Sequence, residues 1–160
     1  MPQKTVATPL FALILIAAPL GAEFLHIEQS LTGLDCISCA ESVGKNLKKI
    51  KGVESAGFRT ADSTAVLDLK PGNTVALADV RDRVKGMGYT PKEAKVTARG
   101  EARMEGGKWM FHLAGSDTQY ALEVSGGAAE ELRQGGTVII EGRLAEPSGP
   151  LTVSAARRGE

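Results

Sequence analysis

Cysteine, histidine and aromatic residues are scarce in this chain, and charge of one sign is not in excess. Of 160 residues, two are cysteine, two are histidine and 4% are aromatic. Neither histidine, His26 or His112, stands in a recognisable nucleophile setting, so no hydrolytic constellation is visible. Residues 23–96 hold 11 basic and 10 acidic side chains, and residues 97–160 hold 7 and 9. Neither half has the basic excess of a nucleic-acid-binding protein, so we expect no nucleic-acid partner.

The chain also lacks an apolar run of the roughly 20 residues that a membrane-spanning helix needs. Residues 10–18 are apolar, follow Lys4 and precede a short stretch that ends in Ala22. A charged start, an apolar middle and a small residue at the exit are typical of a secretory signal. We therefore expect residues 1–22 to be a signal peptide cleaved after Ala22. No cysteine follows to carry a lipid, so the mature protein would be periplasmic or secreted, without a stable membrane anchor.

The two cysteines, Cys36 and Cys39, lie three residues apart at the start of a predicted helix. A thiolate is a soft donor that prefers copper(I), zinc and similar ions. The unpaired N–H groups and the dipole of a helix start favour the thiolate over the thiol. A disulfide that closes so short a loop restricts the unfolded chain little, so the spacing favours a working site. Metal binding and thiol–disulfide exchange both use this layout.

In the first half, the apolar pattern predicts strands at 24–31, 53–59, 64–69 and 89–98. Helices are predicted at 38–50 and from a cap at Thr74 to about Gly86. On the first strand, Leu25, Ile27 and Leu31 are expected to face inward. The order β-α-β-β-α-β predicts the ferredoxin-like arrangement.

In the second half, short strands alternate with glycine-rich breaks. We expect strands at 97–104, 108–114, 120–124, 137–144 and 151–155, with a helix at 128–134. Five strands with a helix between the third and the fourth predict a small OB-like β-barrel. The chain as a whole is then α+β, with a signal peptide at 1–22, a ferredoxin-like domain at 23–97 and an OB-like β domain at 98–160.

Residues 33–39 place Cys36 and Cys39 in a Gly-x-x-Cys-x-x-Cys motif between the first predicted strand and the first predicted helix. With this motif, residues 24–98 resemble the heavy-metal-associated domain, a family that includes copper chaperones, periplasmic mercury-binding proteins and the N-terminal modules of metal-transporting ATPases. Residues 33–39, Gly-Leu-Asp-Cys-Ile-Ser-Cys, match the family's Gly-Met-x-Cys-x-x-Cys with leucine for methionine. They follow the first strand and precede the first helix, as in the family. Gly52-Val53 and Gly88-Tyr89 match two further family positions. The resemblance covers less than half of the chain.

This resemblance implies that Cys36 and Cys39 are the metal ligands. Leu34 would be an apolar peg beneath the metal loop, and Tyr89 would pack beside the site and shield it. Both Leu34 and Tyr89 would be core residues even without a metal.

Asp35 departs from the copper-type members and resembles the Asp-Cys-x-x-Cys variant of zinc, cadmium and lead exporters. A carboxylate is a hard donor that suits zinc and serves two-coordinate copper(I) poorly. Asp35 is therefore a candidate third ligand, and the alternative is a helix cap near Ser38. The cargo is one soft metal ion, and its identity stays open between a zinc-like divalent ion and copper(I).

Other residues offer weaker sites. His26 is expected to be a solvated surface residue. Met110 and His112 share one strand face and could form a second soft-metal site, although surface or barrel filling is the simpler interpretation. Trp109 and Phe111 are most simply core residues rather than a base-stacking platform.

These observations predict an exported metal chaperone or scavenger that holds one ion between two thiolates and passes it on by ligand exchange. Its partner would be a metal-transporting ATPase or another metal-handling protein, which the lysines of the first helix could dock. We expect no enzymatic activity. The alternatives are a thiol–disulfide oxidoreductase using the same pair, although the thioredoxin-like element order is missing, and an interaction module with a vestigial metal site.

Overall fold

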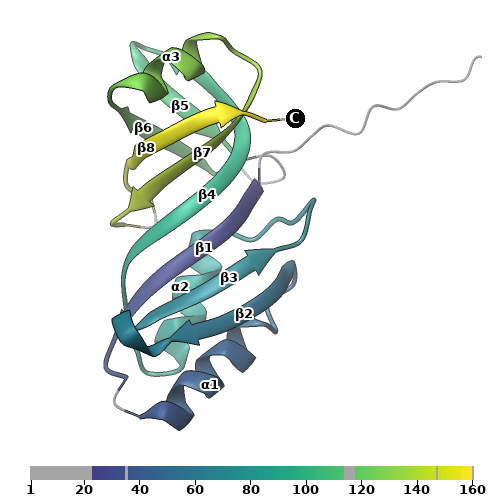
Figure 1. Cartoon of the computed structure of the whole chain (residues 1–160), viewed down its shortest axis with the longest axis vertical. Helices are drawn as coiled ribbons and strands as arrows, with labels where there is room; N and C mark the ends of the chain where they lie inside the picture. Colours follow the sequence, from purple (N-terminus) through teal and green to yellow (C-terminus); the bar gives the residue numbers. More distant parts are fainter. Residues whose placement is uncertain (1–22, 35, 114–117, 147, 160) are drawn as a thin grey trace, which may run out of the picture.

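The structure is a computed structural model that describes residues 23–34, 36–113, 118–146 and 148–159. The predicted signal peptide at 1–22 and the candidate ligand Asp35 lie outside the described residues. Within the described part, no helix is long and apolar enough to cross a membrane. The molecule is elongated, and one strand, β4, runs along much of its length (Figure 1).

The first half is a four-stranded antiparallel sheet with two helices. Its strands are β1 (Glu23–Thr32), β2 (Val53–Arg59), β3 (Thr64–Leu69) and β4 (Thr90–Glu105), in the order β2-β3-β1-β4. Helix α1 (Ile37–Leu47) packs on β2 and β3, and α2 (Leu77–Gly86) packs on β4. On β3, Ala65, Leu67 and Leu69 are buried in the core, whereas Asp68 is exposed. This order confirms the ferredoxin-like fold predicted for the first half.

Helix α1 is shorter than predicted, because tight turns replace its last residues. The N–H of Ile50 donates to the carbonyl of Leu47 and the N–H of Val53 to that of Ile50. Gly52 between them has φ +102, and a Cβ there would lie 2.9 Å from Cγ2 of Val75. Only glycine meets both conditions without strain, so Gly52 completes the turn between the end of α1 at Leu47 and the start of β2 at Val53.

Two local predictions in the first half are wrong. Helix α2 is capped at Ala76, not at Thr74, because the Asp79 carboxylate accepts the Ala76 N–H at 3.1 Å. In β1, Leu25 is only half-buried and Phe24 is buried instead. A bulge between Phe24 and His26 shifts the alternation by one residue at this end of the strand.

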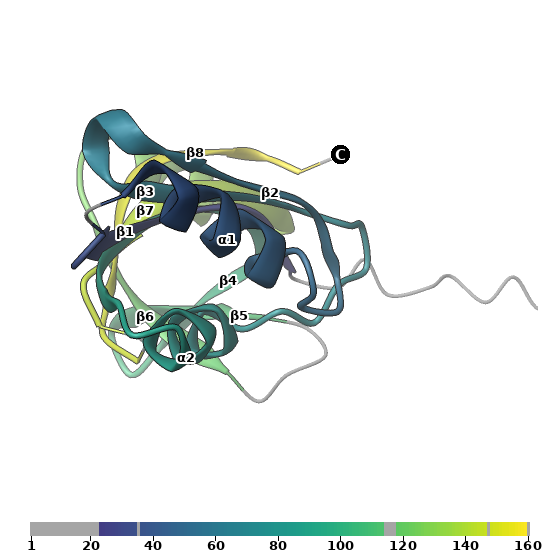
Figure 2. The same ribbon diagram turned by 90° about the horizontal axis from the view of Figure 1, so that it is seen from below.

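The two halves share one strand, because the strands predicted at 89–98 and 97–104 form the single strand β4. The remaining elements are β5 (Lys108–His112), β6 (Gln119–Val124), α3 (Gly127–Arg133), β7 (Thr137–Leu144) and β8 (Leu151–Arg158), and a short 3-10 helix, η1 (Thr60–Asp62), precedes β3. Pairing runs β4-β5-β6-β8-β7, and β7 pairs back onto β4 between residues 94 and 101. Viewed along the long axis, α1 and α2 lie in front of these strands (Figure 2).

One hydrophobic core extends through both halves. The buried apolar residues form a single cluster that runs from Phe24 and Val43 to Leu132 and Val153. At the junction, the rings of Phe24 and Tyr120 meet edge to face with centroids 6.1 Å apart. The sheet and the core therefore join the halves without a linker.

Candidate metal centre

The two cysteines lie at the end of the molecule away from β5–β8, where the chain passes from β1 into α1 (Figure 1). Cys36 is the N-cap of α1, with the extended backbone conformation (φ −141, ψ 147) that a cap requires. Cys39 lies in the first helical turn. The Cys36 side chain is exposed and the Cys39 side chain is half-buried. One sulfur therefore faces solvent more openly than the other.

In the structure a disulfide joins Cys36 and Cys39, with the two Cα atoms 5.3 Å apart. The two side chains thus converge on one point above the helix start. In the reduced protein, two sulfurs that converge in this way can bind one ion together. In the oxidised protein neither sulfur is a thiolate, so the pair cannot bind a soft metal as two anionic ligands.

Hydrogen bonds and the helix start favour negative charge at Cys36. The backbone N–H of Cys39 donates to the Cys36 sulfur at 3.2 Å, and the Ser38 hydroxyl lies 3.3 Å from the same sulfur. The first turn of α1 holds no acidic residue. Unpaired N–H groups and the positive end of the helix dipole therefore act on the sulfur without an opposing carboxylate in that turn.

The loop before the cysteines packs against the turn that follows α2. Gly33 has φ +93, and a Cβ built there would lie 4.0 Å from Cδ1 of Tyr89. Leu34, Met87 and Tyr89 are half-buried and pack against the core. The structure thus brings Leu34 and Tyr89, both singled out from the sequence, beside the cysteine loop.

The described residues supply no third protein ligand for a metal beside the cysteine pair. Among the described residues, no group of three or more histidine, cysteine, aspartate or glutamate side chains could hold an ion. His26 instead accepts or donates a 2.8 Å hydrogen bond with Asp68, and His112 does so with Glu105 at 2.8 Å. Asp35 lies outside the described residues. The site that the structure describes is therefore the cysteine pair alone.

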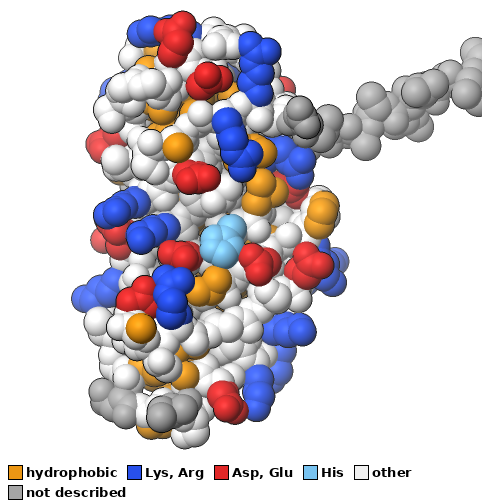
Figure 3. Space-filling model, in the orientation of Figure 1, with side chains coloured by type: hydrophobic (Ala, Val, Ile, Leu, Met, Phe, Trp, Pro, Cys, Tyr) orange, Lys and Arg blue, Asp and Glu red, His pale blue; other side chains and the backbone are white. Residues whose placement is uncertain are grey.

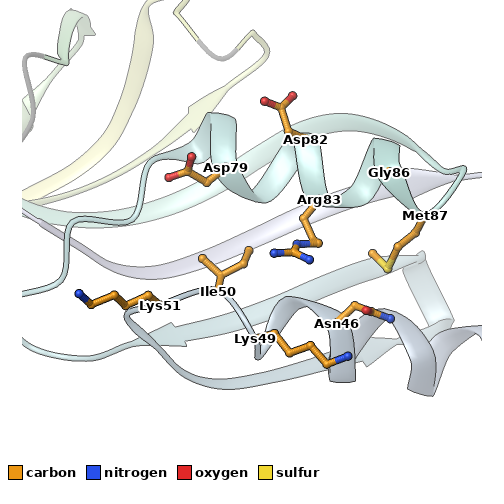
Figure 4. A pocket seen from close by; sticks show the side chains of 9 residues that line it. All are labelled: Asn46, Lys49, Ile50, Lys51, Asp79, Asp82, Arg83, Gly86 and Met87. Atoms are coloured by element: carbon orange, nitrogen blue, oxygen red, sulfur yellow. The ribbon is translucent and has the colours of Figure 1, made fainter.

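A groove of about 620 Å³ lies between α2 and the C-terminal end of α1, with the turn that follows it. Lys49, in the turn after α1, and Arg83, on α2, line the groove, and Asp79 and Asp82 lie on the α2 side (Figure 4). Met87 closes one end of the groove. The lining combines both signs of charge, so the groove presents no single-sign patch.

The sheet face opposite the helices carries paired charges. Arg59 binds Glu28 at 3.1 Å and Asp62 at 2.8 Å. The hydrogen bond from Arg59 holds the pKa of Glu28 below its usual value, and the bond from His26 does the same for the pKa of Asp68. Figure 3 shows acidic and basic side chains intermixed over the visible face of the molecule. These charged groups therefore satisfy one another.

Comparisons with known proteins bear on the first half. Residues 30–90 match the family model of the heavy-metal-associated domain. This chain belongs to the heavy-metal-associated family. A solved structure on crosstalk between Cu(I) and Zn(II) homeostasis is 30% identical, over 42% of this chain and 94% of that one, with a TM-score of 0.36.

Two metal-ATPase domains are also similar to the heavy-metal-associated domain of this chain. The N-terminal domain of a potential copper-translocating P-type ATPase from Bacillus subtilis, solved in its Cu(I)-loaded state, is 28% identical over 43% of this chain and 85% of that one (TM-score 0.39). The N-terminal domain of the zinc(II) ATPase ZiaA is 25% identical over 43% and 64% (TM-score 0.37). A search of curated proteins finds no match.

Sequence reasoning missed the buried polar residues that support this domain. Gln29 is fully buried, and Arg81 is 3% exposed. The signal for Arg81 was present, because Leu77, Val80, Arg81 and Val84 recur at the i, i+3, i+4, i+7 spacing of a buried helix face. A charged residue in such a stripe indicates a buried partner, and that partner can be found only in the folded structure.

Proposed function

We propose that this protein is an exported carrier of one soft metal ion, which it holds between the thiolates of Cys36 and Cys39 and passes on by ligand exchange. The observation that carries the proposal is the convergence of the two sulfurs at an exposed helix start within a domain of the heavy-metal-associated family. Thiolates are the ligands that soft ions prefer.

Two protein ligands suit transfer better than storage. Structural zinc sites close the coordination sphere with four ligands, and a pair leaves positions open. A thiolate of a partner can then join the ion before either cysteine leaves. Cys36 is the more exposed sulfur, so we expect the exchange to begin on its side.

The cargo is zinc or copper(I). A zinc ion would favour Asp35 as a third ligand, because a carboxylate is a hard oxygen donor, whereas copper(I) would need only the two sulfurs. Replacing Asp35 by asparagine therefore distinguishes the metals: zinc affinity falls and copper(I) affinity does not.

The test is a titration of the reduced protein with zinc and with copper(I), under exclusion of oxygen. We expect one equivalent of one of these ions to bind, and we expect Cys36→Ser and Cys39→Ser to abolish that binding. Ser42→Ala, on the exposed side of the same helix, is the matched control and keeps the wild-type isotherm. Absence of binding by the reduced wild-type protein rejects the proposal.

The disulfide between Cys36 and Cys39 favours one second candidate, a thiol–disulfide oxidoreductase. In that reaction a substrate dithiol would reduce the Cys36–Cys39 bond and leave as a disulfide, or the reverse. Reduction of insulin by dithiothreitol is the test. Turnover that disappears in Cys36→Ser would favour this candidate over the carrier.

The second half would act as an adaptor built as an OB-like barrel. Support comes from the pairing order β4-β5-β6-β8-β7, the return of β7 onto β4 and the parallel β6–β8 pair.

The partner would be a metal-transporting ATPase or another metal-handling protein that docks on Lys45, Lys48 and Lys49. Transfer of the bound ion to an isolated ATPase metal domain, slowed by added salt, would support such docking. Export is tested by mass spectrometry of the protein isolated from cells. A mass equal to that of residues 23–160 would support removal of a signal peptide after Ala22.

A further inference from the structure

Arg81 is a buried charge that no part of the metal site uses directly. Its side chain is 3% exposed, although it lies on α2 of the heavy-metal-associated domain. Burial lowers the pKa of Arg81, and the charge of Glu146 opposes this effect. A guanidinium stays protonated even so, and a buried cation is costly unless every donor finds a partner.

The partners of Arg81 come from three places in the chain. Its Nε donates to the Gln29 side chain at 3.0 Å, which ties it to β1. Its Nη2 lies 3.0 Å from the carbonyl of Lys92 in β4. The same nitrogen lies 2.9 Å from the carbonyls of Leu144 and Ala145, where β7 ends. Arg81 therefore clamps α2 of the first half to a strand end of the second half.

Gln29 supports this clamp from the other side. The residue is fully buried, and its Nε2 donates to the carbonyl of Lys92 at 2.8 Å. Since Arg81 also bonds the Lys92 carbonyl, the two side chains share an acceptor and hold each other in place. A network satisfied in this way is rigid, because moving one member leaves buried polar atoms unpaired.

Val84, one helical turn after Arg81, links α2 to the turn that lies beside the cysteine loop. Val84 is fully buried, and its carbonyl accepts the N–H of Met87 at 3.1 Å and of Tyr89 at 3.3 Å. The Tyr89 ring in turn lies beside Gly33, at the start of the cysteine loop. Helix α2 and the turn after it thus connect the end of β7 to Tyr89, which lies beside the cysteine loop.

We propose that Arg81 is a positioning residue for the metal site, and that the second half of the protein anchors α2 through it so that Tyr89 stays against the cysteine loop. This inference rests on the proposed function, in which the loop holds a soft ion. Its consequence is kinetic: the clamp slows the escape of the ion to small chelators without supplying a ligand. The second half is then part of the site's support and not only a module attached to it.

The test uses full-length protein loaded with zinc or with copper(I) and mixed with an excess of a coloured chelator for that ion. Arg81→Met keeps an unbranched aliphatic side chain, shorter by the guanidinium group, and removes its donors. We expect it to raise the release rate about threefold to tenfold while one ion still binds per chain, because residues in one hydrogen-bond network are energetically coupled. Lys85→Met makes the same kind of change on the exposed side of α2 and leaves the rate unchanged.

A double-mutant cycle with Tyr89→Ala separates positioning from general destabilisation. If Arg81 acts through Tyr89, then Arg81→Met adds nothing to the release rate of Tyr89→Ala. Additive effects, or an unchanged rate in Arg81→Met alone, overturn the inference. If Arg81→Met does not fold, Arg81→Lys carries the same test, because it keeps the charge and loses the planar fork.

Amide hydrogen exchange keeps the inference distinct from the proposed function. In the metal-free reduced protein, Arg81→Lys should raise exchange at Tyr89 and at Cys39 more than in the core of β7. Faster exchange spread evenly over the molecule would show a structural role alone and reject the inference. Failure of the wild-type protein to bind any metal would reject the proposed function and leave this readout intact.

Discussion

The two halves of the molecule bury different chemistry. In the described residues, every buried polar or charged side chain lies in the first half: Glu23, Gln29, Thr64, Asn73 and Arg81. The core of the second half is built from apolar and aromatic side chains such as Phe111, Ile140 and Val153. The half that holds the cysteine pair is therefore also the half whose interior contains buried polar side chains.

This difference shows what each half contributes. Apolar burial is not directional, so it stabilises the second half without fixing the position of any one group. Buried hydrogen bonds fix geometry, because an unpaired partner is costly. In the first half, buried hydrogen bonds hold a loop in place: the side-chain amide of Asn73 donates to the carbonyl of Phe24 at 2.8 Å and to that of Lys70 at 2.8 Å. A loop that must hold two cysteine side chains together needs such support.

The largest expected effect concerns the cysteine pair itself. Oxidation to the Cys36–Cys39 disulfide should abolish binding of zinc or copper(I), because the disulfide offers no thiolate. Isothermal titration of the oxidised and the reduced protein measures this directly. The thermal midpoint should change little between the two, since the closed loop is short. Equal affinity in both forms would place the metal site elsewhere.

A second prediction compares two glutamate–arginine pairs. Glu23 is 5% exposed, pairs with Arg99 and accepts the N–H groups of Gly72 and Asn73. Glu23→Ala should lower the free energy of unfolding by about 3 kcal/mol, because it leaves buried partners unpaired. Glu101, which pairs with Arg103 on the surface, is the control: Glu101→Ala should cost less than about 1 kcal/mol. Urea unfolding gives both values, and equal costs would remove the distinction between the halves.

A smaller effect is expected from the apolar core of the second half. Ile140 is fully buried in β7. Ile140→Val removes one methyl group and should cost about 1 kcal/mol of unfolding free energy. Because that core positions no loop, metal affinity and release rate should stay at wild-type values. A changed release rate in this variant would mean that the core of the second half reaches the site by a route other than Arg81.

The smallest effect is a pH dependence of stability. Hydrogen bonds from His26 and Ser55 lower the pKa of Asp68, and Arg59 lowers that of Glu28. A carboxyl whose pKa is lower in the folded state contributes stability that is present above about pH 4 and lost below it. Because Asp68 is more than half exposed, we expect less than about 1 kcal/mol from it. Thermal midpoints between pH 3 and pH 7 should fall less steeply in Asp68→Asn than in the wild type.

Much of the fold could be predicted from local pattern. The strands Val53–Arg59, Thr64–Leu69 and Thr137–Leu144 begin and end where the alternation places them. The continuous strand β4 could not be predicted, since a change of partner from β1 to β5 leaves no mark on a strand's own sequence. The cap of α2 was misplaced because Asp79 satisfies Ala76 from inside the helix.

The residues of the candidate site also divide into those that local sequence predicts and those that only long-range contacts reveal. Cys36 and Cys39 were found because their spacing and the following helix are local features. Arg81 was missed because its partners, Leu144 and Ala145, are more than 60 residues away in sequence. Motifs therefore indicate the candidate ligands, whereas long-range hydrogen bonds indicate the residues that hold their helices and loops in place.

The central claim is that the reduced cysteine pair holds one soft metal ion. Its most direct test is native mass spectrometry of the protein isolated without oxygen or added reductant, with a count of free thiols. The account predicts one zinc or copper(I) ion per chain, with both thiols recovered after the metal is removed, and no bound metal in Cys36→Ser. A metal that remains bound in Cys36→Ser, or a reduced wild-type protein that binds none, would contradict it.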